Sequence, residues 1–145
     1  KQIIETTTKS TRIKKVWTAN EAGHRFRLLR GQTGPAYAAL VLSESGQNQL
    51  GTREPRYQVD GGPLRLLADY GMFLDMSAKI VEWPVWDGLK PPCSQTETIG
   101  WRDEALCEIL QGRRIEFHYD LVTGETRKTV FTLDGAREAI EGVLF

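Results

Sequence analysis

The chain has 145 residues, with 19 basic and 19 acidic side chains and a hydrophobic fraction of 40%. This length and composition predict a single globular domain over residues 1–145 and exclude a disordered or fibrous chain. No apolar run approaches the roughly 20 residues that cross a bilayer as a helix, so a membrane span is not expected.

Strands are expected through the first part of the chain. Residues 1–10 are rich in Thr, which is typical of an edge strand or of a frayed arm. Apolar patterning predicts further strands over 11–18, 24–30 and 36–43. The last of these is apolar throughout, so it fits a strand that is buried on both faces, and a helix is the alternative.

Turn residues divide the middle of the chain. A strand that starts near Arg56 is broken at "DGGP", residues 60–63, because two glycines permit a tight turn and proline donates no ladder hydrogen bond. Asp60 is therefore interpreted as a turn residue. Short strands are expected at 72–76 and 78–85, followed by a loop with two prolines.

The last third of the chain predicts two short helices. Asp103 is a suitable N-cap for a helix over about 103–111, which Gly112 is placed to end. A second helix is expected over about 134–144, with Asp134 as its cap. Helices that follow a strand-rich first part indicate an α+β fold with an antiparallel sheet or a sandwich-like core.

The segment between these helices predicts a hairpin. Phe117 and Phe131 each belong to a set of apolar residues at alternate positions of a strand. Both sets share one face if Phe117 lies opposite Phe131, which centres an odd-length loop on Gly124. A two-residue Thr123–Gly124 turn would place Phe117 opposite Val130 instead. We therefore expect the odd-length loop.

The sequence holds no recognisable catalytic constellation. A catalytic histidine needs a positioned partner and a substrate proton within hydrogen-bond reach, yet His24 and His118 are both expected at outward positions of strands. No phosphate-binding loop, nucleophile motif or set of metal ligands occurs. We therefore expect a protein that is not an enzyme and that binds no metal and no cofactor.

The four tryptophans are prominent aromatic residues in a chain of this size. The first interpretation is that they anchor the core. The alternative is a protein-binding surface, because Trp is enriched where proteins meet. The segment "EWPVWDGL" predicts such a surface, formed by Trp83, Trp86 and Leu89.

Basic and acidic residues are unevenly distributed. Residues 1–56 hold ten Lys or Arg and four Asp or Glu, whereas residues 57–145 hold nine and fifteen. The basic excess is interpreted as the solvent faces of strands, where Lys and Arg discourage edge pairing, so a nucleic-acid partner is not expected. The functional alternative is a basic surface for nucleic acid or anionic lipid. The residues of this basic surface are Arg12, Lys14, Lys15, Arg25, Arg27 and Arg30. A third alternative is self-association between a basic and an acidic half.

Two cysteines, Cys93 and Cys107, leave two alternatives. In an oxidising compartment they can form a disulfide that closes a loop of about 15 residues. Otherwise they are unpaired thiols, with Cys107 on a buried helix face. Their spacing matches no zinc motif.

Two segments carry a resemblance to known proteins. One is "YQVDGGPL" from residue 57, and the other is "FTLDGAREAI" from residue 131. The second matches an F-x-L-x-G-x-x-x-A-aliphatic pattern through Phe131, Leu133, Gly135, Ala139 and Ile140. Over residues 57–145 the chain resembles the invasion-associated locus B family and the periplasmic accessory proteins of type VI secretion, which are small secreted proteins of Gram-negative bacteria.

The resemblance implies a periplasmic or secreted domain without catalytic residues that acts through contacts with another protein. It also favours a disulfide between Cys93 and Cys107. The leading hypothesis is therefore a non-enzymatic accessory domain of the cell envelope. The first alternative is an inhibitor or immunity-type protein that blocks an enzyme with a loop such as residues 84–95. The second is a nucleic-acid-binding module that uses the basic N-terminal strands.

Overall fold

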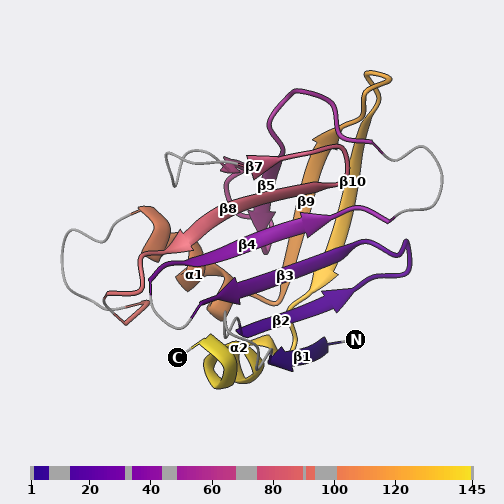
Figure 1. Ribbon diagram of the computed structural model, residues 1–145. Helices are drawn as coiled ribbons and strands as arrows, with labels where there is room; N and C mark the ends of the chain where they lie inside the picture. Colours follow the sequence, from indigo (N-terminus) through magenta and orange to yellow (C-terminus); the bar gives the residue numbers. More distant parts are fainter. Residues whose placement is uncertain are drawn as a thin grey trace.

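The computed structural model describes residues 2–6, 14–31, 34–43, 49–67, 75–89, 91–93 and 101–144. These residues form two antiparallel sheets and two short helices (Figure 1), which confirms the predicted α+β fold with a sheet core. The larger sheet has six strands in the order β1-β2-β3-β4-β8-β7, and the smaller sheet has four strands in the order β10-β9-β5-β6.

The six-stranded sheet contains most of the N-terminal half of the chain. Its strands are β1 (Gln2–Thr6), β2 (Lys14–Ala19), β3 (Arg25–Arg30), β4 (Ala36–Val41), β7 (Asp75–Met76) and β8 (Ile80–Trp86). The central strand β4 pairs with β3 and β8, so the strand alternative for its apolar sequence is the correct one. Of the strand expected at 72–76, residues 72–74 lie outside the described residues, and β7 comprises the remaining two.

The four-stranded sheet is built around β9. Its strands are β5 (Arg56–Val59), β6 (Arg65–Leu66), β9 (Arg114–Asp120) and β10 (Thr126–Thr132). After β5, Asp60 has a φ of 52° and Gly61 a φ of 71°, as a tight Asp-Gly turn requires. The Asp60 carboxylate accepts hydrogen bonds from the amides of Arg113 and Arg114, both at 3.0 Å. Asp60 is thus a turn residue that also fixes the start of β9.

The β9–β10 hairpin has the expected odd-length loop, but its register differs from the prediction. Phe117 lies opposite Thr129, and Phe131 lies opposite Ile115, two residues away from the predicted pairing. The reason is that Gly124, with a φ of 89°, ends a three-residue loop instead of standing at its centre. A shift of two residues keeps both phenylalanines on one face, with ring centroids 6.0 Å apart.

The two sheets pack face to face, and their strands cross at a steep angle (Figure 1). Phe26 of the larger sheet contacts Phe117 and Phe131 of the smaller one, with ring centroids 5.5 and 6.0 Å apart. Trp83 completes this aromatic centre at 5.7 Å from Phe117. The core therefore joins strands that are far apart in the sequence.

Hydrogen bonds add a polar joint at one corner of the sandwich. Asn20, in the turn between β2 and β3, donates from Nδ2 to Thr129 Oγ1 at 2.6 Å and to the Val130 carbonyl at 3.1 Å. The Asn20 Oδ1 atom accepts the backbone N–H of His24 at 3.1 Å. One side chain thus connects the larger sheet to the edge strand of the smaller one.

The two helices are α1 (Trp101–Gln111) and α2 (Ala136–Leu144), and they pack against β8 and β2 respectively. Helix α1 begins two residues before the predicted start, so Asp103 falls in its first turn, where an acidic residue is also favoured. Helix α2 begins two residues late, because Gly135 adopts a φ of 74° and the amide of Ala136 donates to the Leu133 carbonyl at 2.9 Å. This turn carries the chain from β10 into the helix.

Candidate interaction loop beside the disulfide

Several residues singled out in the sequence meet where β8 ends beside α1. They are Arg30, Trp86, Leu89, Cys93 and Cys107. The chain that leaves β8 forms a loop, of which residues 87–89 and 91–93 are described. We call these residues the Leu89 loop.

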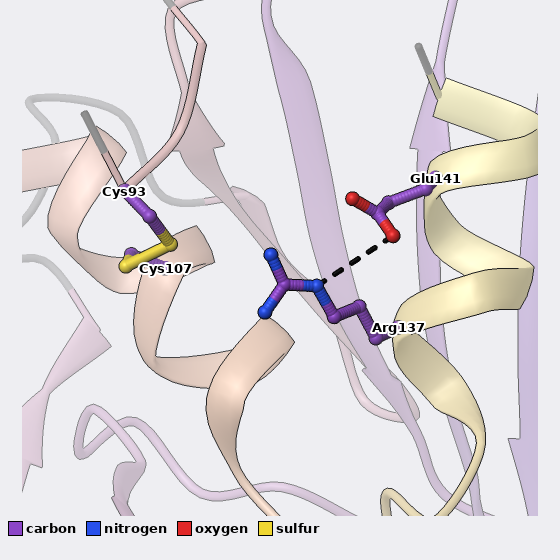
Figure 2. The surroundings of a disulfide bond; sticks show 4 residues. All are labelled: Cys93, Cys107, Arg137 and Glu141. Atoms are coloured by element: carbon purple, nitrogen blue, oxygen red, sulfur yellow. Dashed lines mark ion pairs between the residues drawn. A yellow bond between two sulfur atoms is a disulfide. The ribbon is translucent and has the colours of Figure 1, made fainter.

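A disulfide fixes the far end of the Leu89 loop. Figure 2 shows Cys93 bonded to Cys107 in α1, with an S–S distance of 2.06 Å. The same view shows Arg137 and Glu141 of α2, which form an ion pair at 3.6 Å. Because the two sulfur atoms are bonded, the alternative of unpaired thiols does not apply, and both cysteines are half-buried. The crosslink ties the loop to a helix that itself packs on β8.

The two tryptophans that were predicted to form a binding surface are buried. Trp83 is 1% exposed and Trp86 is 5% exposed. Both side chains belong to the core between the two sheets and the helices. The prediction of an exposed surface at Trp83 and Trp86 is therefore wrong, and the alternative of core anchors is correct for both.

Arg30 holds the near end of the Leu89 loop. Its Nε donates to the Gly34 carbonyl at 2.9 Å, Nη1 to the Leu144 carbonyl at 2.8 Å and Nη2 to the Gly88 carbonyl at 3.4 Å. The guanidinium also lies over the Trp86 ring, 4.4 Å from its centroid. A planar guanidinium with five N–H donors suits this task, which a lysine could not perform. Arg30 is thus a structural residue and not part of an open basic surface.

Leu89 projects from this framework into solvent. Its side chain is 84% exposed, the highest value among the large hydrophobic residues that the structure describes. The Leu89 amide donates to Asp87 Oδ1 at 2.9 Å, which closes a local turn. Gly88 has a φ of 81°, and a side chain there would collide with the Gly34 carbonyl. An apolar side chain is thus presented on a backbone that is held from both sides.

The other predicted basic residues do not gather with Arg30. Lys14 is exposed at the start of β2, whereas Lys15, Arg25 and Arg27 lie on the outward face of the larger sheet. Arg12 lies outside the described residues. The alternation of side chains along β2 and β3 places Lys15, Arg25 and Arg27 on one face of the sheet and Lys14 and Arg30 at positions of the opposite face, so the predicted set of cations is divided between two faces.

His24 is buried, which corrects the prediction that it points outward. It shares the strand parity of Phe26, so its 5% exposed ring lies between the sheets. Its Nδ1 accepts the amide N–H of Ser43 at 2.9 Å, and its Nε2 lies 3.3 Å from Tyr119 Oη. Burial, with smaller effects of the cations Arg127 and Lys79, holds the pKa of His24 below its ordinary value.

His118 faces outward on β9, as expected, but its surroundings give no catalytic arrangement. Its Nε2 lies 2.8 Å from Glu116 Oε2, and this hydrogen bond lowers the pKa of Glu116. Gln58 Nε2 donates to the same oxygen at 3.0 Å. Among the described residues, no three His, Cys, Asp or Glu side chains are grouped so that they could hold a metal ion.

Comparison with known proteins gives no relative from which a function could be transferred. No family model, no curated protein and no solved structure matches the chain. Within the described residues, no helix is long and apolar enough to cross a membrane. The function therefore has to be argued from the geometry of the Leu89 loop.

The sequence gives no signal for the support of this loop. The partners of Arg30 are backbone carbonyls at residues 34, 88 and 144, which no local pattern reveals. A signal for the loop itself was present in "DGL", residues 87–89. An Asp followed by Gly indicates a turn, which places the next residue near a tip.

Proposed function

We propose that this chain is a non-enzymatic, protein-binding accessory domain that inserts Leu89 into an apolar pocket of another protein. The observation that carries the proposal is the 84% exposed Leu89 side chain on a loop whose two ends are held. A single exposed leucine is common on protein surfaces. The fixed backbone distinguishes Leu89, because a preorganised loop loses little conformational entropy on binding.

The disulfide supports a periplasmic or secreted location for this domain. Disulfides persist in oxidising compartments, whereas cytosolic thiols are kept reduced. The resemblance of residues 57–145 to small secreted proteins of Gram-negative bacteria points to the same location. We therefore include the periplasm or the exterior of a Gram-negative cell in the proposal.

An inhibitor or immunity-type protein is the second candidate, and the same loop favours it. A preorganised loop with one apolar side chain at its tip is suited to fill an enzyme's specificity pocket. The two candidates share the contact through Leu89 and differ in the class of partner. Loss of the partner's enzymatic activity on complex formation would identify the inhibitor.

The test places a photo-crosslinking benzoylphenylalanine at Pro91, an exposed position of the Leu89 loop, in protein produced in its source cells. The chain with native Leu89 should give one dominant adduct. Leu89→Asp should abolish it, because a carboxylate in an apolar pocket costs several kcal/mol without a compensating partner. The free energy of unfolding should change by less than about 0.5 kcal/mol, because an exposed side chain contributes little to the core.

The matched control is Val122→Asp, which puts the same charge on another exposed apolar residue. Val122 is 61% exposed in the turn between β9 and β10. This variant should keep the adduct at its original yield. An adduct that survives Leu89→Asp, or one that disappears equally in Val122→Asp, would show that the Leu89 loop is not the binding element.

A further inference from the structure

We infer that the outward face of the six-stranded sheet is a second binding surface, which takes an acidic segment of a protein. This inference does not depend on the Leu89 loop, because it concerns other residues of the sheet. The side chains that carry it are Trp17, Arg25, Arg27, Tyr37, Val41 and Ile80. We call them the Trp17 face.

The Trp17 face is more apolar than a solvated sheet face. Figure 1 shows this side of the sheet toward the viewer, with the smaller sheet behind it and neither helix across it. Antiparallel sheets with one face in water ordinarily place polar residues on that face. Here Trp17, Tyr37, Val41 and Ile80 are all half-buried on the outward side. Such a patch marks a contact surface more often than isolated apolar residues do.

Two arginines on the Trp17 face have hydrogen-bonding capacity to spare. The guanidinium of Arg25 lies over Trp17, 4.4 Å from the ring centroid, and it forms no ion pair with any described residue. Arg27 lies opposite Trp17 in register, and 28% of its side chain is exposed. The ion pair of Arg27 with Glu82 is long, at 3.9 Å. Carboxylates are the groups that guanidinium donors bind best, through two parallel hydrogen bonds.

The arrangement of charge favours a protein segment over a nucleic acid. Glu82 is an anion on the same face, and Asp75 lies opposite it in register on β7. A phosphate chain that crossed the sheet would run from the arginines into these acidic positions, where it would be repelled. Arg25 also covers one side of the Trp17 indole, which removes a stacking surface for bases. A short segment with one or two carboxylates beside apolar side chains matches both the arginines and the apolar side chains of the Trp17 face.

The test titrates the isotope-labelled full chain with a peptide of Asp, Glu, Phe and Leu and follows the indole and amide signals by NMR. We expect saturable shifts at Trp17, Arg25 and Tyr37. Raising the salt from about 50 mM to about 500 mM should weaken binding at least fivefold, because it screens exposed charges. Arg25→Glu should also weaken binding at least fivefold, through repulsion of the carboxylates.

Three controls make the outcome decisive. Lys128→Glu reverses an exposed charge on the outward face of β10 and should bind the peptide as the unmodified chain does. Leu89→Asp should also leave binding unchanged. Arg25→Gln removes the charge without reversing it, so binding can still be measured if Arg25→Glu disturbs β3. This variant should weaken binding at least twofold. The inference fails if no saturable shift appears, if Lys128→Glu weakens binding as much as Arg25→Glu, or if oligothymidine binds more tightly than the peptide.

Discussion

The imidazole of His24 lies between the two sheets, where its Nδ1 accepts the amide proton of Ser43. Protonation would turn Nδ1 into a donor that faces another donor. Because burial lowers the pKa of His24 below 6.5, the unfolded chain takes up this proton first as the pH falls. The stability that the neutral ring contributes is therefore fully present above about pH 6.5, and it is lost as the pH falls from there toward the pKa of His24 in the folded chain.

This linkage predicts a difference between the unmodified chain and His24→Gln. As the pH falls from about 7.5 to about 5, the free energy of unfolding of the unmodified chain should fall more steeply, by up to about 1.4 kcal/mol per pH unit. His24→Gln should start from a lower stability and lack this extra slope. Urea unfolding at a series of pH values measures both, and parallel curves would contradict the assignment.

Gly112 predicts a second single-residue effect, because it stands where α1 ends against the smaller sheet. A Cβ atom there would collide with the Val59 side chain and lie 3.0 Å from the Glu108 carbonyl. Gly112→Ala should therefore lower the free energy of unfolding by about 1–3 kcal/mol. The matched control is Gly142→Ala in α2, where a Cβ atom meets none of the described residues within 4 Å.

Gly142→Ala should raise stability by about 0.5–1 kcal/mol, because alanine restricts the unfolded chain and favours the helix. Chemical denaturation of the two variants, measured side by side, should therefore give shifts of opposite sign. If both variants shift stability in the same direction, the contacts of a Cβ atom at Gly112 with Val59 and Glu108 do not destabilise the fold.

We expect the disulfide at helix α1 to contribute to the stability of the fold. The bond between Cys93 and Cys107 closes a loop with a sequence separation of 14 residues. Constraining a loop of this length in the unfolded chain is worth roughly 3 kcal/mol. Replacing both cysteines by serine should remove about this amount while the sheets remain folded, because their aromatic contacts do not involve the crosslink.

Denaturant unfolding with and without a reductant checks this prediction. Reduction should lower the midpoint of the unmodified chain and leave that of the double serine variant unchanged. If the reductant has no effect on the unmodified chain, the disulfide does not contribute to folding stability.

The strands and helices illustrate what local sequence patterns can determine. The alternation in β9 and β10 predicted the buried face and the odd-length loop, because parity depends only on neighbouring residues. It did not predict the register, which depends on the place of Gly124 within the turn. The start of α2 differed by two residues for the same reason, since it depends on the backbone turn at Gly135.

The assembly of the whole molecule depends on contacts that sequence patterns do not contain. Strand β5 pairs with β9, although more than 50 residues separate them, and no local signal assigned these strands to a second sheet. The sequence leaves Trp86 open as a surface or a core residue, because Arg30, which lies over its ring, is distant along the chain. The candidate site was therefore predictable only at Leu89 and, through the resemblance, at the two cysteines.

The contact between Asn20 and β10 also bears on how the folded molecule behaves at high concentration. An edge strand is a template for the addition of further strands, which is the first step of fibre formation. In β10, the Val130 carbonyl already accepts a hydrogen bond from Asn20, so an approaching strand finds this ladder position occupied. The larger sheet thus blocks one ladder position on this edge of the smaller sheet, and we expect Asn20→Ala to make fibre formation at high concentration faster.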